Sequence, residues 1–311
     1  MSCVPALDCW FLTGPTAAGK TRVGIELAQR INAEIVSMDS MALYRGMHIG
    51  TDKPTPEQRR AVEHHVIDLI EPHEQYSLAQ YVDAAHRVIE QIRSGGREVL
   101  FVGGTPLYLK GLLRGIFQGP PADWEFRHRL REQAREHDPQ WLQRRLAEVD
   151  PASAERLHAN DVRRLIRALE VYEKMGRPIS ELQRQFETGH PAEDCRVFVL
   201  NWPHRDLHAR IDRRVDEMFQ AGLVDEVRGL LARPQPLSRT ARQAVGYREV
   251  IDHVRGECSL PDTIAAVKTH TRQLAKRQRT WFRGLSECRF IPAFGMEAEE
   301  IARRIAETKP S

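Results

Sequence analysis

Residues 14–21 follow a spacing that is typical of a phosphate-binding loop, G-x-x-x-x-G-K-[ST], between a strand-like run and a helical pattern. The loop consists of Gly14, Pro15, Thr16, Ala17, Ala18, Gly19, Lys20 and Thr21. Its backbone N–H groups can close around phosphate oxygens, and the start of the following helix adds a positive dipole. We expect Lys20 to neutralise the terminal phosphate and Thr21 to ligate Mg²⁺ through its hydroxyl. Because such a loop holds only oxygens, ATP and an organic diphosphate look alike to it.

Asp39 and Thr105 each follow a strand-like run, where a parallel sheet gathers the residues that bind ligands. A carboxylate at position 39 can hold Mg²⁺ through water or accept a proton from an attacking nucleophile, and it can also be the N-cap of the next turn. Gly103 and Gly104 allow the backbone to approach a ligand closely. The same residues also fit an ordinary strand-to-helix turn. A functional role for the Thr105 hydroxyl is therefore expected only because the phosphate-binding loop would place phosphates near it.

The apolar runs before these residues predict an α/β fold with a parallel sheet of the P-loop NTPase type and helices on both faces. The strand-like runs are short and do not alternate, as in strands buried on both faces, and they occur at residues 10–13, 34–38, 98–102 and 196–201. Helical patterns at 21–30 and 78–93 separate the first three runs. After the fourth run we expect only helices.

The stretch from about residue 119 to residue 195 differs, because it contains charged amphipathic segments and no convincing strand. Its clearest helix pattern begins with Asn160 as the N-cap, places Leu165 and Leu169 on one face, and stops at Gly176. We therefore predict an all-helical insertion domain at 119–195. It separates a first part of the core, 1–118, from a second part, 196–311, that carries basic C-terminal helices.

Composition excludes several classes of protein. The chain has 311 residues, 41% of them hydrophobic and 29% charged, and no apolar run approaches the ~20 residues that cross a bilayer. The start of the chain lacks the pattern of a secretory signal, and the five scattered cysteines form no C-x-x-C pair that would indicate zinc or a disulfide framework. We expect a cytoplasmic monomer with no membrane partner.

Positive charge collects in the C-terminal third. The net charge of the whole chain is only +3, but residues 263–286 hold no acid and six cations: Lys268, Arg272, Lys276, Arg277, Arg279 and Arg283. A helix with such a face could follow the phosphates of a nucleic acid, although a solvated surface helix has the same pattern. We expect Trp281 and Phe282, near its end, to be core anchors.

Several strings along the chain together resemble the tRNA dimethylallyltransferase (tRNA isopentenyltransferase) family. Asp39 and Ser40 lead into LYRGMHIGTDKP at 43–54, and GGT-x-x-Y follows at 103–108. The remaining strings are ND-x-RR-x-x-RALE at 160–170, RI-x-x-R-x-x-x-M at 210–218, VGYR at 245–248 and TRQLAKRQ at 271–278. The resemblance covers about residues 8–290, and IGT-x-KP and TRQLAKRQ are among its most specific parts.

The resemblance implies transfer of a dimethylallyl group from dimethylallyl diphosphate to an exocyclic amine in tRNA, with Mg²⁺ and with release of diphosphate. The acceptor is the adenosine on the 3′ side of the anticodon. Asp39 is then the general base, and Lys20, Thr105 and the Mg²⁺ on Thr21 stabilise the leaving diphosphate, which Arg214 clamps from the far side. The helix pattern around Arg214 also allows a surface salt bridge.

The implied partner is the anticodon stem-loop, gripped on one side by the insertion. The expected tRNA contacts are Asp39, Ser40, Met41, Ala42, Thr105, Arg127, Asn160, Asp161, Val162, Arg163, Arg164, Arg242, Gln243, Ala244, Val245, Gly246, Tyr247, Lys276 and Arg277. Position 42 departs from the family, because many members have Gln there in D-S-x-Q-x-Y. A solvated face is the alternative for Arg127 and Arg163.

Three other functions use the same residues. A P-loop kinase of a nucleoside or small metabolite would employ Lys20, Thr21 and Asp39 on ATP, but the long insertion and the basic C-terminal helices exceed what a small acceptor needs. Prenylation of free adenine nucleotides would need no such polynucleotide surface. A non-catalytic RNA-binding module would bind RNA in a salt-dependent manner without turnover.

Overall fold

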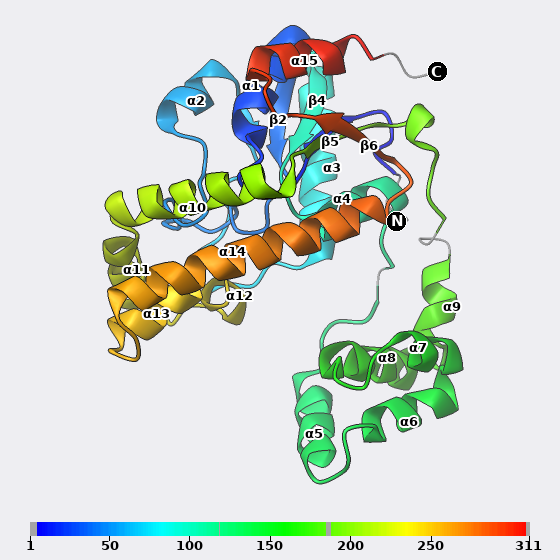
Figure 1. The fold of residues 1–311 in the computed structure, drawn as a ribbon. Coiled ribbons are helices and arrows are strands. Elements are labelled where there is room, and N and C mark those ends of the chain that lie inside the picture. Colours follow the sequence, from blue (N-terminus) through cyan, green and yellow to red (C-terminus); the bar gives the residue numbers. More distant parts are fainter. Residues whose placement is uncertain (1–4, 118, 185–187, 309–311) are drawn as a thin grey trace. The chain divides into compact units, whose positions relative to one another are not determined.

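A parallel sheet organises the larger part of the chain in the computed structural model, which describes residues 5–117, 119–184 and 188–308 (Figure 1). Its six strands run in the order β3-β2-β4-β1-β5-β6, and all of their pairings are parallel. The strands are β1 (Trp10–Thr13), β2 (Ala33–Ser37), β3 (His64–His65), β4 (Glu98–Val102), β5 (Arg196–Asn201) and β6 (Cys288–Pro292). The predicted parallel α/β core is confirmed.

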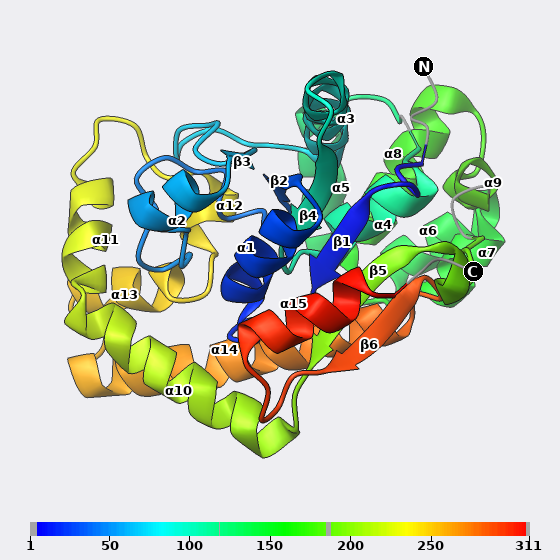
Figure 2. The same cartoon turned by 90° about the horizontal axis from the view of Figure 1, so that it is seen from above.

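The central strands form a core that is closed on both faces. Phe11 of β1 and Phe101 of β4 are fully buried and stack with ring centroids 4.9 Å apart. Helices α1 (Lys20–Arg30) and α15 (Ala298–Ala306) pack against each other on one face, and α3 (Leu78–Ser94) covers the other, as seen in Figure 2. Because β1 lies between β4 and β5, the phosphate-binding loop starts where the strand order changes direction.

Two strands escape the sequence patterns. β3 has only two residues, too few for any periodicity, and β6 contains Arg289 and ends at Pro292 on the edge of the sheet. The expectation of helices alone after residue 201 is therefore wrong. The strand predicted at 34–38 is shifted by one residue, and the helices predicted at 21–30 and 78–93 are confirmed with ends that differ by one residue.

A second layer of helices follows β5. In Figure 1, α10 (His204–Gln220) and α14 (Leu260–Arg283) run side by side and contact each other. Lys268 and Arg272 of α14 form ion pairs with Asp216 and Asp212 of α10, at 2.7 and 3.0 Å. The other α-helices of the larger part of the chain are α2 (Pro56–Ala61), α4 (Pro106–Arg114), α11 (Leu223–Leu231), α12 (Arg239–Arg242) and α13 (Tyr247–Val254).

Residues Arg114–Thr188 form a compact unit of their own. Its helices are α5 (Trp124–Arg135), α6 (Trp141–Val149), α7 (Pro151–Arg156), α8 (Val162–Met175) and α9 (Ile179–Gln183). Leu146 and Leu165 are fully buried in its apolar core. Helix α8 starts later than predicted, since its N-cap is Asp161 and the backbone N–H of Asn160 donates to His158 Nδ1.

None of the helices among the described residues is long and apolar enough to cross a membrane. The domain boundaries predicted at 119 and 195, and the role of the insertion in gripping tRNA, stay predictions.

Candidate active site

The loop at 14–21 connects β1 to α1, and side chains from outside the loop donate hydrogen bonds to two of its carbonyls. Gly19 has φ +89° and Ala17 has φ +63°, both in the left-handed region that turns the chain into the helix. Arg210 Nε donates to the carbonyl of Ala17 at 2.8 Å, and the Trp202 indole N–H donates to that of Ala18 at 3.1 Å. Because these bonds occupy carbonyls, they help to fix the loop before any anion arrives.

The Lys20 ammonium lies over this loop and donates to the carbonyl of Pro15 at 2.9 Å. It forms no ion pair with any of the residues described. Desolvation lowers the pKa of Lys20 to about 8, a change that the charge of Asp39 opposes and that of Arg214 reinforces. The loop therefore holds a cation that is short of negative charge.

Asp39 and Thr105 follow the carboxyl ends of β2 and β4, which are neighbours in the sheet. Asp39 Oδ1 accepts the backbone N–H of Met41 at 2.9 Å, and the Thr105 hydroxyl accepts that of Ser40 at 3.0 Å. Gly103 makes this approach possible, because a Cβ there would overlap the carbonyl of Met38. The carboxylate and the hydroxyl thus belong to two turns that are bonded to each other.

Arg214 reaches the phosphate-binding loop from α10. Its Nη1 donates to Thr16 Oγ1 at 2.9 Å, and its Nη2 lies 3.4 Å from Asp52 Oδ2. The buried Nε has no hydrogen-bond partner among the described residues. The guanidinium therefore contacts the loop, and it also pairs with a carboxylate that the sequence interpretation did not include. Its clamping of a diphosphate stays a prediction.

One cavity of about 650 Å³ collects these groups. Among the predicted residues, it is lined by Thr16, Ala17, Gly19, Lys20, Thr21, Asp39, Ser40, Met41, Ala42, Thr105, Arg214, Gln243, Ala244, Val245, Tyr247 and Arg277. Six more in this part of the chain, Gly14, Pro15, Ala18, Arg242, Gly246 and Lys276, do not line it. The side chain of Ala42 is buried, and its carbonyl accepts the N–H of Asp68.

The cavity wall also contains residues to which the sequence interpretation gave no role, above all Asp52, Lys53 and Gln278. Lys53 and Gln278 belong to the strings IGT-x-KP and TRQLAKRQ, so the only signal was membership of a specific string. Spacing could not assign their contacts, because Gln278 acts on residues that lie 262 and 174 positions away.

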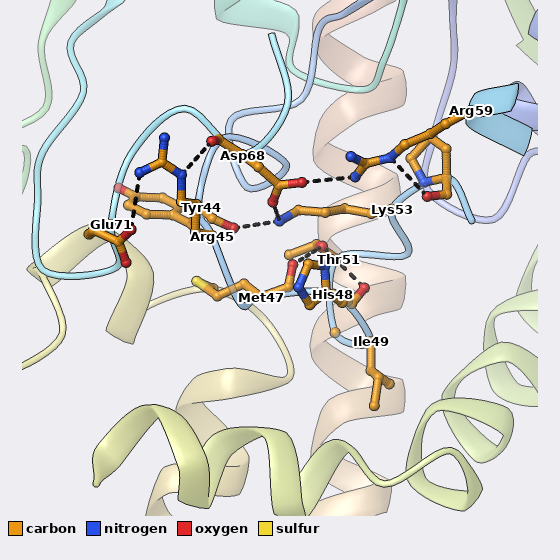
Figure 3. Close-up of polar contacts among 12 residues, drawn as sticks. Tyr44, Arg45, Met47, His48, Ile49, Thr51, Lys53, Arg59, Asp68 and Glu71 are labelled. Carbon is orange, nitrogen blue, oxygen red and sulfur yellow. Dashed lines mark hydrogen bonds and ion pairs between the residues drawn. The ribbon is translucent and has the colours of Figure 1, made fainter. Parts of the chain in front are cut away.

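Lys53, which lines the cavity, holds the segment 44–68 together through polar contacts that Figure 3 shows. Its side chain is 2% exposed, and its ammonium donates to the carbonyl of Tyr44 and to Asp68 Oδ1, the latter at 2.6 Å. The other oxygen of Asp68 pairs with Arg59 at 3.0 Å. Burial raises the pKa of Asp68, but the hydrogen bonds from Lys53 and Arg59 outweigh it and hold the pKa below its ordinary value.

Two side chains hold the adjoining turn, residues 48–50. Glu226 of α11 accepts the backbone N–H groups of His48 and Ile49, both at 2.8 Å. The Tyr247 hydroxyl donates to the same carboxylate at 2.6 Å. The segment that carries Asp52 into the cavity is therefore tied to α11 and α13 on one side and to Lys53 on the other.

The predicted contacts in the unit Arg114–Thr188 have different surroundings. Arg127 donates through Nε and Nη2 to the fully buried Glu170, at 2.8 and 2.7 Å. Arg164 pairs with Asp161 at 3.3 Å, whereas Arg163 is exposed. Arg127 thus has a structural task within its own unit.

Helix α14 differs from the prediction at its C-terminal end. Phe282 is fully buried, as expected for a core anchor, but Trp281 is 41% exposed, so its assignment as a core anchor is wrong. Lys276 and Arg277 are both exposed, and Arg277 lines the cavity. The basic helix therefore presents Arg277 to the cavity, whereas its Lys268 and Arg272 form ion pairs with α10.

The donor set fits a Mg²⁺ ion that a phosphorylated ligand shares with the protein. No group of three or more His, Cys, Asp or Glu side chains that could hold a metal occurs among the described residues. Mg²⁺ commonly takes one or two protein oxygens and completes its shell with phosphate and water. The Thr21 hydroxyl and the Asp39 carboxylate, which line the same cavity, are oxygens of this kind.

The fold and the cavity define the class: a parallel α/β protein with a P-loop at the switch point of its sheet. The model of the IPP transferase family matches residues 42–285. A tRNA dimethylallyltransferase of Rhodopirellula baltica is 47% identical over 296 residues, covering 92% of this chain and 88% of the relative. That of Symbiobacterium thermophilum is 46% identical and covers 96% and 95%. The chain therefore belongs to the IPP transferase family.

Solved structures agree with this assignment. The tRNA isopentenylpyrophosphate transferase of Bacillus halodurans is 35% identical with a TM-score of 0.70, covering 97% of this chain and 96% of that one. A eukaryotic dimethylallyltransferase acting on tRNA is 28% identical with a TM-score of 0.75, covering 92% and 74%.

Proposed function

We propose that this chain transfers a dimethylallyl group from dimethylallyl diphosphate to the exocyclic amine of the tRNA adenosine that follows the anticodon. The observation that carries the proposal is one cavity that joins a phosphate-binding loop, the Asp39 carboxylate and the Arg277 face of a basic helix. The names of the relatives support the transferred group, and the eukaryotic structure acting on tRNA supports the acceptor.

Asp39 is the general base in this proposal. The amine nitrogen attacks the allylic carbon, the C–N bond forms as the C–O bond to diphosphate breaks, and the surplus proton on nitrogen passes to the carboxylate. An aromatic amine becomes acidic only as that bond forms, so an ordinary carboxylate can accept the proton. Oδ1 already accepts the N–H of Met41, so the other oxygen is the freer acceptor.

The departing diphosphate carries growing negative charge, and the cationic side chains at the loop end of the cavity stabilise that charge. Lys20 gains the anionic partner that it lacks among the described residues, and Arg214 approaches from α10 at Thr16. Thr105 lies on the turn bonded to Ser40, and its hydroxyl donates a hydrogen bond to the same diphosphate in this proposal. Mg²⁺ held by Thr21, and by Asp39 through water, would add positive charge to the leaving group.

The acceptor base must leave the stack of the anticodon loop to enter the cavity, at a cost of a few kcal/mol. We assign the phosphate contacts that offset this cost to Arg277 and Lys276 on α14, and to the unit Arg114–Thr188 through its exposed Arg163. A monomer in the cytoplasm, where tRNA is modified, completes the proposal.

The test compares acceptors side by side. The purified chain is incubated with Mg²⁺ and labelled dimethylallyl diphosphate, and with either a tRNA transcript that has adenosine after the anticodon or free AMP, ADP or ATP. Digested products are analysed by mass spectrometry. We expect a prenylated adenosine from the tRNA alone. Product from the free nucleotides instead, or phosphate transfer from ATP to a nucleoside in a parallel assay, would overturn the proposal.

A further inference from the structure

Gln278 joins two loops of the cavity that are far apart in the sequence. It lies on α14, is 8% exposed, and uses both ends of its side-chain amide. The amide oxygen accepts the backbone N–H of Thr16 at 2.9 Å, and the amide N–H donates to the carbonyl of Gly104 at 2.7 Å. Thr16 belongs to the phosphate-binding loop and Gly104 to the turn that carries Thr105.

The amide sits beside the cation of the loop. A Cβ added to Gly104 would lie 2.8 Å from Gln278 Nε2 and 3.4 Å from Lys20 Nζ, so these two nitrogens flank the same backbone position. Thr16 is also bonded through its hydroxyl to Arg214. Gln278 therefore completes a frame around Lys20 that consists of the loop, the turn and two helices.

A side-chain amide suits this place because it has a donor and an acceptor at one fixed spacing. An ionised carboxylate could still accept from Thr16 but could not donate to Gly104, and an apolar side chain would leave both backbone groups without a partner. The frame thus depends on the amide chemistry of position 278 and not merely on its volume.

We propose that Gln278 is a positioning residue, one that fixes the separation between the phosphate-binding loop and the Thr105 turn and so aligns Lys20 and Thr105 on the diphosphate. The proposal rests on the proposed function of the cavity. Because Arg277 and Leu274 of the same helix also line the cavity, α14 links the surface that faces the acceptor to the frame that holds the donor. A misplacement of about 1 Å in such a frame can cost about 10²-fold in rate.

The experiment uses the full chain with Gln278→Met, which keeps the length of the side chain, and Gln278→Glu, which keeps its shape and removes the donor. Gln273→Glu is the matched control, since it makes the same change at an exposed position of α14 outside the cavity. Single-turnover rates, the KM for dimethylallyl diphosphate, the Kd for tRNA and the melting temperature are measured for all of them.

We expect both Gln278 variants to lose about 10- to 100-fold in single-turnover rate. Gln278→Glu should also raise the donor KM the more, because it places an anion beside the diphosphate. The tRNA Kd should stay near that of wild type and of Gln273→Glu, and the melting temperature should fall only modestly, because one or two backbone groups lose their partner. A rate within twofold of wild type in both variants would overturn the proposal, as would a parallel loss of melting temperature and tRNA affinity.

The wild-type reaction separates this test from the proposed function. If wild-type protein forms no prenylated tRNA, the proposed function fails. Calorimetric binding of dimethylallyl diphosphate alone then still decides on Gln278: a weaker affinity in both variants supports the positioning role, and equal affinity overturns it.

Discussion

Two charged side chains, the partly buried Lys20 at the cavity of the core and the fully buried Glu170 in the unit Arg114–Thr188, have opposite surroundings. Glu170 accepts from Arg127, Arg167 and the backbone N–H of Asp123. Burial raises its pKa, but the bonds from Arg127 and Arg167 outweigh this and hold it below the ordinary value. Among the described residues, the Lys20 ammonium forms one hydrogen bond, to the carbonyl of Pro15, and no ion pair, and desolvation lowers its pKa against the opposing charge of Asp39.

The difference separates structural charge from functional charge. In a fully paired buried cluster, every charge and hydrogen-bonding group already has a partner. Such a cluster fixes the fold of its unit and has no free charge with which to bind a ligand. A desolvated cation without a carboxylate partner is costly to the free protein, and that cost is recovered when an anion binds. Lys53 resembles Glu170 in being paired, although it borders the cavity. Mutations on the two sides should therefore affect different properties.

The largest effect is expected at the cavity, with Asp39→Asn. Asn can still accept the N–H of Met41, so the turn survives, but it cannot take the proton of the amine. The single-turnover rate at saturating substrates should fall about 10²- to 10⁴-fold with little change in tRNA affinity. Rapid-quench measurements test this, and an unchanged rate would reduce Asp39 to the cap of a turn.

Lys20→Ala should lower the turnover by roughly 10²- to 10³-fold, because the leaving diphosphate loses its nearest cation. Unlike a change in the paired cluster, it should leave the melting temperature of the free protein equal or higher, since a desolvated charge has been removed. Steady-state kinetics test the predicted loss of turnover, and melting curves test the predicted melting temperature. A clear drop in melting temperature would place Lys20 with the structural charges.

Glu170→Gln should act on the other side of the comparison. It leaves Arg127 and Arg167 without a charged partner, which typically costs about 3–5 kcal/mol. Hydrogen exchange should show faster opening of α5 and α8, while the binding of dimethylallyl diphosphate to the core stays unchanged. Glu173→Gln, at an exposed site of the same helix, is the control. Unchanged protection of α5 and α8 would contradict the structural role of the cluster.

The lowered pKa of Lys20 predicts uptake of protons on donor binding. A bound diphosphate raises the pKa of the ammonium from its value of about 8 in the free protein. Between the two values, binding must add up to about one proton to Lys20, and the uptake should vanish well below pH 8, where Lys20 is already charged. Calorimetry with dimethylallyl diphosphate in buffers of different ionisation enthalpy measures it. Uptake that persists in Lys20→Ala would refute the assignment.

The smallest effect concerns α14. If Lys276 and Arg277 contact tRNA phosphates, removing either should reduce the slope of log K against log salt by about one unit. Arg303→Ala is the control, because Arg303 is paired with Glu300 and Glu307 on α15. Filter binding across a salt series measures the slopes. An equal slope for Arg277→Ala and the control would remove the helix from the RNA-binding surface.

The sequence predicted those parts of the site that depend on local order. A glycine-rich loop between strand and helix, and a carboxylate at a strand end, follow from neighbours in the chain, and both line the cavity. Gln278 and Asp52 had no such local signal, because their partners are distant in sequence. The partners of Lys53 are only 9 and 15 residues away, but they lie in irregular segments whose spacing follows no helical or strand period. Trp281 was misjudged because helical periodicity alone does not say which face is covered.

Residues of the last third of the chain hold the phosphate-binding loop near its start, and this has a consequence for synthesis of the protein. The backbone N–H of Thr16 donates to the side chain of Gln278, 262 residues later, and α15, which follows α14 in the chain, packs on α1. At a ribosomal pace of about 5–20 residues per second, a nascent chain therefore carries its phosphate-binding loop for tens of seconds without these supports. A chain that ends before α14 is complete therefore contains the whole phosphate-binding loop but lacks the bonds from Gln278 that hold the loop against the Thr105 turn.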